Sequence, residues 1–207
     1  MKILFLGNDT TNSQLFDWLV SENPYDQFAY LCGKLSEEYI LEVAPDLVVS
    51  YSYPHIITAE LLRILPEMIV NLHISLLPFN RGADPNAWSA IEKTPSGVTI
   101  HLIDKGVDTG DILYQEEVSF DGGDLTLRES YDALQFSIQL LFQKNWPDIR
   151  AKRSPRQTQS SKGTFHRVSD LGSIKDRLLG AQGWDIKRSV LQERYFELIG
   201  EKKNEAL

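Results

Sequence analysis

Three polar residues are spaced so that they could act together on one carbonyl carbon. Asn71 and His73 lie two residues apart at the end of a predicted strand, so their side chains project from the same face. In open α/β sheets, ligands collect beyond the carboxyl ends of the strands, where this pair would lie. Asp108 belongs to a turn segment, residues 104–111, whose two glycines permit tight turns that would aim its carboxylate at His73.

This set suits a reaction through a tetrahedral intermediate that carries an oxyanion. The Asn71 amide would donate a hydrogen bond to the oxyanion, an interaction worth about 3–4 kcal/mol in enzymes that lose such a donor. His73 would accept and return a proton, and Asp108 would orient the ring and relay protons through an ordered water. Because an amine substrate brings its own nucleophile, we predict group transfer onto nitrogen without a covalent enzyme intermediate.

Each of these residues also has a simpler interpretation. A histidine at a strand end is usually structural, and an aspartate in a glycine-rich turn usually serves the turn itself. The combination favours catalysis, because a loop with a proline and a glycine, residues 75–82, follows the strand directly. His101, in a later strand, is interpreted as structural.

Six short apolar runs predict the strands that would carry this set. They alternate with helical patterns, which is typical of an α/β fold: a Rossmann-like, mostly parallel sheet with helices on both faces. The expected strands are Ile3–Leu6, Phe28–Cys32, Leu47–Ser50, Met68–Leu72, Val98–Ile103 and Ile112–Val118.

Capping residues place the shorter helices between these strands. Thr10 or Thr11 would cap the first helix and Ser36 a short acidic one. Thr58 would cap a third helix, which Pro66 ends.

The longest helical pattern precedes a change in composition. It starts near Thr126 and continues to about Lys144, with apolar residues at steps of three or four. Residues 150–163 are basic and polar, which predicts a surface arm, and helical patterning then returns. We therefore expect a catalytic domain over residues 1–150 and a small C-terminal extension over residues 151–207 that packs on it.

Composition excludes several classes of partner. The net charge of −8 argues against nucleic acid or an anionic membrane, although a phosphorylated small molecule remains open. With Cys32 as the only cysteine, neither an intrachain disulfide nor a thiolate zinc cage is possible, and no metal is expected. No apolar stretch reaches about 18 residues, and no cleavage site follows the first apolar run. A cytoplasmic protein is expected.

Two motif blocks closely resemble the formyltransferase family that uses N10-formyltetrahydrofolate. The blocks are residues 71–78 with Arg81 and Gly82, and then residues 97–101 and 108–112. The resemblance covers roughly residues 1–145. It implies that a formyl group passes from the folate to a primary amine.

The resemblance also assigns site residues. The family's catalytic asparagine, histidine and aspartate fall on Asn71, His73 and Asp108. By similarity, backbone groups of two segments hold the pterin, although ordinary packing would also explain the apolar members. The implied cofactor-binding residues are Tyr53, His55, Ile56, Ile57, Asp104, Lys105, Gly106 and Val107.

The family serves several amine acceptors, and two are disfavoured here. Enzymes that formylate methionyl-tRNA carry an additional basic C-terminal domain, whereas this chain ends sooner and is acidic. Glycinamide ribonucleotide enzymes have a glycine-rich, phosphate-binding turn after the first strand, and residues 7–11 contain one glycine and an aspartate.

Residues 81–88 and the pattern between Asn145 and Asp170 look like the small sugar N-formyltransferases of bacterial surface-polysaccharide (lipopolysaccharide O-antigen) synthesis. This implies a homodimer whose substrate is a nucleotide-linked 4-amino-4,6-dideoxyhexose, such as dTDP-4-amino-4,6-dideoxyglucose. Packing in the core or at a dimer surface would equally explain the aromatic residues. The candidate substrate-binding residues are Phe79, Asn80, Arg81, Gly82 and Trp88.

Two further alternatives concern charge and catalysis. The basic residues of the arm would bind a diphosphate or simply form a solvated surface; they are Arg150, Lys152, Arg153 and Arg156. A non-catalytic folate- or nucleotide-binding protein is the alternative from a different class, and it conflicts with the intact catalytic set. A dinucleotide oxidoreductase is disfavoured because the first strand is not followed by Gly-X-Gly-X-X-Gly.

Overall fold

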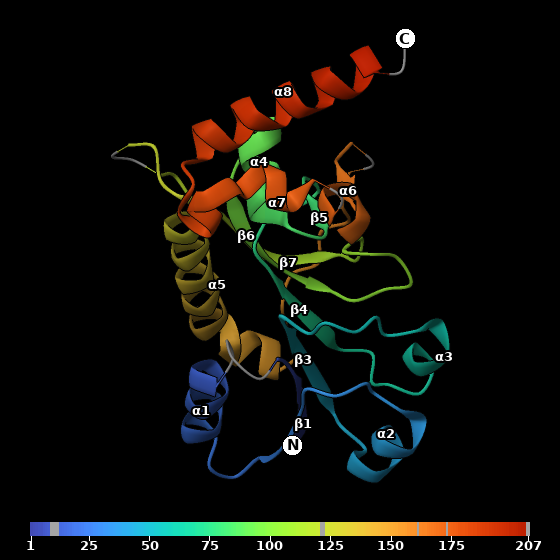
Figure 1. Cartoon of the computed structure of the whole chain (residues 1–207). Helices are drawn as coiled ribbons and strands as arrows, with labels where there is room; N and C mark the ends of the chain where they lie inside the picture. The colour runs from blue at the N-terminus through green and yellow to red at the C-terminus, as the bar shows by residue number, and fades with distance from the viewer. Residues whose placement is uncertain (9–12, 121–122, 161, 173, 206–207) are drawn as a thin grey trace. The chain divides into compact units, whose positions relative to one another are not determined.

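The computed structural model describes residues 1–8, 13–120, 123–160, 162–172 and 174–205 (Figure 1). The chain forms two compact units, each assembled from three segments. Unit 1 comprises residues 1–73, 99–114 and 139–159; unit 2 comprises residues 74–98, 115–138 and 160–207. The division of the chain at residue 150 stays a prediction.

All six expected strands are present, each within one residue of its predicted bounds. They are β1 (Lys2–Leu6), β2 (Gln27–Leu31), β3 (Leu47–Tyr51), β4 (Ile69–His73), β6 (Gly97–Leu102) and β7 (Ile112–Glu117). The strand order is β2-β1-β3-β4-β6-β7. The first four strands pair in parallel, and β6 joins β4 antiparallel. The fold is the expected Rossmann-like one, and β6 joins β4 in the antiparallel direction.

Helices cover both faces of the sheet in unit 1, as the alternation of side chains along β1 requires (Figure 1). Leu4 and Leu6 pack in one apolar cluster with residues of α2 (Glu37–Val43) and α3 (Ala59–Leu62). Phe5 faces the other way and meets Phe16 of α1 (Ser13–Glu22) edge to face, with ring centroids 5.5 Å apart.

The predicted helix caps have mixed outcomes. The Ser36 hydroxyl accepts a hydrogen bond from the Tyr39 backbone N–H, so that cap is confirmed. Thr58 precedes α3, but its side chain makes no capping hydrogen bond and the helix ends at Leu62. Since α3 buries no side chain fully, packing does not extend it to the expected proline. Thr10 and Thr11 lie outside the described residues.

The longest helix, α5 (Leu127–Arg150), continues beyond its expected end and through Pro147. Proline inside a helix removes one hydrogen bond, so other contacts must compensate. Trp146 is buried at 4% exposure, and Arg150 donates two hydrogen bonds of 2.9 Å to Asp26 in the same unit. These contacts hold the last turn, which local propensity alone would not predict.

Unit 2 has its own helical core, which confirms the helical patterning after residue 170. Buried apolar side chains of α4, the first turn of α5 and the C-terminal helices form it. A short parallel pair, β5 and β8, joins the start of this unit to its last segment. The elements are β5 (Arg81–Gly82), α4 (Pro85–Glu92), β8 (Phe165–His166), α6 (Val168–Gly172), α7 (Lys175–Leu179), a 3₁₀ helix (Gly180–Asp185) and α8 (Arg188–Glu205). None of the described helices is both long and apolar enough to span a bilayer.

Candidate active site

A compact polar cluster lies in unit 1 where β4 ends beside β6. The two strands are antiparallel, and their register sets Asn71 directly opposite His101 and His73 opposite Thr99. Asp108, from loop 104–111, completes the cluster with its side chain 14% exposed. The predicted trio is therefore brought together, with His101 as a fourth member.

The Asp108 carboxylate lies between two imidazoles. Its Oδ2 is 3.7 Å from His73 Nδ1, and its Oδ1 is 3.4 Å from His101 Nε2. The two rings are nearly perpendicular, with centroids 6.2 Å apart. Both His73 and His101 are buried, so bulk water screens their interaction with the Asp108 carboxylate poorly.

His101 fixes the orientation of the Asn71 carboxamide. His101 Nδ1 lies 2.8 Å from the Leu102 carbonyl oxygen, which only accepts, so this nitrogen carries the hydrogen. In the neutral ring, Nε2 then accepts from Asn71 Nδ2 at 3.1 Å. The same Asn71 nitrogen points its second hydrogen at Asp108 Oδ1 at 3.4 Å, a longer and weaker contact.

The loop that carries Asp108 is held from inside by Asp104. Asp104 Oδ1 accepts hydrogen bonds from the Gly106 N–H at 2.9 Å and from the Thr109 hydroxyl at 2.7 Å. Asp108 itself has a φ of 51°, in the left-handed region. A side chain at Gly110 would collide with the Leu102 carbonyl oxygen, so glycine is needed where the loop returns to β6.

The two predicted pterin-binding segments border one apolar cluster in unit 1. Tyr53 and Ile57 from the first segment pack against it, as does Ile103, which precedes the second. Ile56 is 80% exposed and Val107 is 43% exposed, so both segments present apolar side chains to solvent.

The Tyr53 hydroxyl has a structural use. It donates to the Gly33 carbonyl and accepts from the Leu35 N–H, both at 2.8 Å. Burial raises the pKa of this phenol, so the hydroxyl stays neutral. His55 lies edge-on to the Tyr53 ring, with centroids 5.2 Å apart.

Two of the predicted substrate-binding residues are buried within unit 2. Asn80 has no exposed surface and hydrogen bonds to Thr94 and Thr164. Trp88 is 4% exposed and stacks face to face on His166 at 3.8 Å between centroids. This packing gives both residues a structural role, and their contact with substrate stays a prediction.

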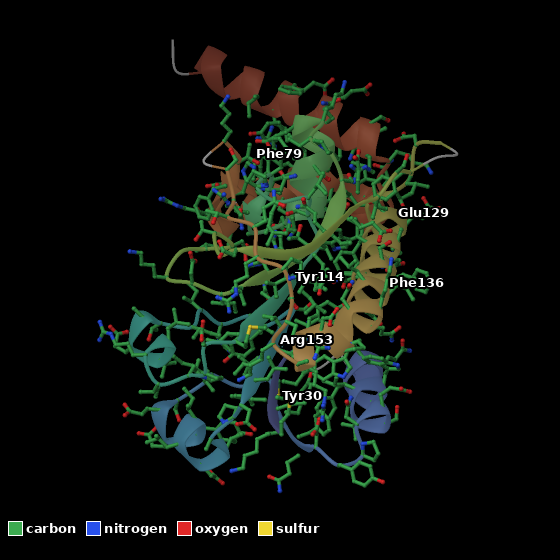
Figure 2. The ribbon with its side chains drawn as sticks, turned by 180° about the vertical axis from the view of Figure 1, so that it is seen from behind. Tyr30, Phe79, Tyr114, Glu129, Phe136 and Arg153 are labelled. Carbon is green, nitrogen blue, oxygen red and sulfur yellow. The ribbon has the colours of Figure 1, made fainter. Side chains whose placement is uncertain are left out.

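The other three candidates, Phe79, Arg81 and Gly82, are half-buried. The Phe79 side chain is labelled in Figure 2. The Arg81 guanidinium donates to the Ser160 carbonyl at 3.2 Å. Their role in binding stays a prediction.

The basic arm is largely neutralised by carboxylates. Arg150 binds Asp26, Arg153 (labelled in Figure 2) binds Asp148 at 3.2 Å, and Arg156 approaches Glu67 at 3.4 Å. These pairs favour the interpretation of the arm as a surface segment over a diphosphate site.

His101 is the member of the cluster that the sequence interpretation set aside. Its signal was available, because it belongs to the polar face of a strand whose other face is Val98, Ile100 and Leu102. Its position beside Asn71 depends on the antiparallel register, which the alternation does not determine.

Comparison with known proteins places these residues in a recognised context. A family model described as formyl transferase matches residues 27–141, a span that contains the whole cluster. A methionyl-tRNA formyltransferase from Clostridium botulinum is 40% identical over 119 residues, which are 55% of this chain and 38% of that protein. The chain thus spans well under half of the length of this curated relative.

Two solved structures match over more of their length. The formyltransferase PseJ from Anoxybacillus kamchatkensis, in complex with UDP-4,6-dideoxy-4-formamido-L-AltNAc and tetrahydrofolate, is 37% identical with a TM-score of 0.83. The match covers 92% of this chain and 97% of PseJ. A sugar N-formyltransferase from a Shewanella species is 25% identical with a TM-score of 0.76, covering 94% of this chain and 87% of that one.

Proposed function

Because the chain belongs to the formyl transferase family, we propose that it transfers the formyl group of N10-formyltetrahydrofolate to the 4-amino group of a nucleotide-linked 4-amino-4,6-dideoxy sugar. The observation that carries the acceptor is the match to PseJ over 97% of its length. The products named with PseJ are a UDP-linked 4-formamido sugar and tetrahydrofolate. We therefore infer a UDP-linked acceptor in preference to a dTDP-linked one.

The reaction follows from the cluster. The sugar amine attacks the formyl carbon, and the carbonyl electron pair moves to oxygen to give a tetrahedral oxyanion. Asn71 Nδ2 donates to this oxyanion and gives up its long 3.4 Å contact with Asp108. His101 keeps the amide in place through the 3.1 Å hydrogen bond.

His73 moves the proton. It accepts the proton that the attacking nitrogen loses, and its imidazolium is stabilised by Asp108 Oδ2 at 3.7 Å. The tetrahedral adduct then collapses, the bond between the formyl carbon and N10 breaks, and the proton held by His73 passes to N10, which restores the neutral imidazole. A formamide and tetrahydrofolate result, without an acyl-enzyme.

The folate is assigned to the two segments that border the apolar cluster. Their backbone groups would hydrogen bond the pterin, while the exposed Ile56 and Val107 side chains would cover its faces. The cytoplasmic location, the homodimer and the use of the product in surface polysaccharide belong to the same proposal.

The chain is similar both to methionyl-tRNA formyltransferases and to sugar N-formyltransferases, so membership of the family does not by itself identify the acceptor. The amine acceptor must therefore be tested by comparing candidate acceptors directly. Purified protein is incubated with N10-formyltetrahydrofolate and one acceptor at a time. The acceptors are UDP-linked and dTDP-linked 4-amino-4,6-dideoxy sugars, glycinamide ribonucleotide and methionyl-tRNA.

Mass spectrometry should show one added formyl group on the UDP-linked amino sugar. The matched UDP sugar with a hydroxyl in place of the 4-amine should gain nothing. Formylation of methionyl-tRNA or glycinamide ribonucleotide, with both amino sugars unchanged, would overturn the acceptor assignment.

A further inference from the structure

Gln159, which is distant in the sequence, forms hydrogen bonds to the loop that carries Asp108. Gln159 Nε2 lies 2.9 Å from the Asp108 carbonyl oxygen and 2.7 Å from the Gly110 carbonyl oxygen. A primary amide nitrogen carries two hydrogens, so both bonds form at once. These bonds join residues 51 and 49 positions apart within unit 1.

The loop needs an external support of this kind. Residues 104–107 are exposed, so few buried contacts fix the loop. Asp108 is held in the left-handed region, which costs an ordinary residue about 1–2 kcal/mol and persists only where neighbouring groups enforce it. Asp104 supplies hydrogen bonds from within the loop, and Gln159 supplies them from outside.

A short backbone pairing two residues before Gln159 holds this glutamine in position. Ile112 and Gln157 form an antiparallel bridge with N···O distances of 2.8 and 2.9 Å. The bridge ties the chain just before Gln159 to the start of β7, immediately after the loop. The amide is therefore built into the fold and is half-buried.

We propose that Gln159 is a positioning residue for formyl transfer: its amide fixes the backbone at Asp108 and so sets the carboxylate between His73 and His101. This inference rests on the proposed function. Placement matters because a displacement of about 1 Å at a catalytic group can cost about 100-fold in rate.

The diagnostic variant is Gln159→Glu. It preserves shape but sets carboxylate oxygens against two carbonyl oxygens, so both hydrogen bonds become repulsive contacts. We expect kcat to fall about 10- to 100-fold, with the KM for the amino sugar changed less than about threefold. Gln157→Glu is the matched control, since it makes the same change on an exposed side chain two residues away.

The pH dependence separates positioning from a general structural role. When the carboxylate introduced by Gln159→Glu is protonated, the side chain regains one hydrogen-bond donor. The ratio of the Gln159→Glu rate to the wild-type rate should therefore rise as pH falls toward the range where carboxyl groups protonate. Gln159→Ala removes both hydrogen bonds without adding charge. Its kcat should fall less than that of Gln159→Glu, and the ratio of its rate to the wild-type rate should not change with pH. This variant tests the proposal even if Gln159→Glu fails to fold.

Hydrogen exchange gives a readout that needs no substrate. Peptides covering residues 104–111 should exchange faster in Gln159→Glu than in wild type or Gln157→Glu. If exchange and kcat are both unchanged, or exchange rises while kcat does not fall, the positioning role is overturned. An inactive wild type that keeps the exchange contrast would instead count against the proposed function.

Discussion

Two loops, one in each unit, contain most of the predicted site residues and are built alike. Loop 104–111 in unit 1 has Asp108 at a φ of 51°, and loop 75–82 in unit 2 has Asn80 at a φ of 56°. Each is tied by hydrogen bonds to the later part of the chain, the first by Gln159 and the second by Thr164.

The two left-handed residues use their side chains differently. The Asp108 carboxylate approaches two imidazoles, while other residues hold its backbone. The Asn80 side chain holds its own loop: it is fully buried and forms hydrogen bonds with Thr94 and Thr164. Asp108 and Asn80 thus have side chains of similar shape and the same left-handed backbone conformation, yet one side chain approaches the imidazoles and the other holds its own loop. Burial and partners distinguish them.

The largest effect should come from removing the Asp108 charge. Asp108→Asn keeps the size of the side chain but cannot stabilise a protonated His73, so kcat should fall about 100- to 1,000-fold. Steady-state formyl transfer measures it, with an unchanged circular dichroism spectrum and unfolding midpoint as the control. A kcat within threefold of wild type would show that Asp108, like Asn80, has a structural role and not a catalytic one.

Asn80→Ala should lower the free energy of unfolding, in contrast with Asp108→Asn, which should mainly lower kcat. Loss of the two hydrogen bonds made by this buried side chain should lower the free energy of unfolding by about 1–3 kcal/mol. Denaturant unfolding measures this, and Thr164→Val should couple to it in a double-mutant cycle. Thr158→Val, on an exposed threonine, is the control. If Asn80→Ala left the free energy of unfolding unchanged but abolished kcat, Asn80 would have a catalytic role and not a structural one.

Gln159 and Thr164, which hold the two loops, follow Arg150 in the chain, and Arg150 pairs with Asp26. Loss of this ion pair should lower the free energy of unfolding by less than the Asn80→Ala substitution does. Arg150 lowers the pKa of Asp26, so the stabilisation is complete above the usual carboxyl range and disappears as pH falls through the lowered pKa. Asp26→Asn should lose about 1–2 kcal/mol at pH 7 and match wild type once the pH lies below the lowered pKa of Asp26. Unfolding midpoints measured across pH test this. A difference that persists in acid would contradict it.

The smallest effect should come from the exposed arm. Arg156→Ala breaks a pair with Glu67 whose side chains are 45% and 82% exposed. The KM for the nucleotide sugar should change by less than about twofold, because such pairs contribute little and the arginine is already engaged. A tenfold increase in KM would restore the diphosphate role of the arm.

The strands and the shared face of Asn71 and His73 were predictable from the sequence because their signals are local. Apolar runs fix where a buried strand lies, and the two-residue spacing fixes that Asn71 and His73 share a face. Asp108 was predicted from its glycine-containing turn, and the resemblance to the family points to the same residue. His101 required the register between β4 and β6, a tertiary property that strand alternation does not contain.

The packing partners of Asn80 and Trp88 could not be predicted for a similar reason. Asn80 bonds to Thr164, 84 residues away, and Trp88 stacks on a histidine from β8. A motif read along the chain cannot show partners from so distant a segment. Likewise, the last turn of α5 passes through Pro147 because of contacts to the N-terminal part of unit 1, which outweigh local propensity.

The assignment of chemistry to the polar cluster is tested by single-turnover formyl transfer with prebound N10-formyltetrahydrofolate, comparing wild type with His73→Ala. Prebinding separates the chemical step from folate capture. We expect the rate to fall about 100- to 10,000-fold while the folate dissociation constant stays within threefold. A rate within tenfold of wild type would show that the proton passes through another group and would contradict the assignment.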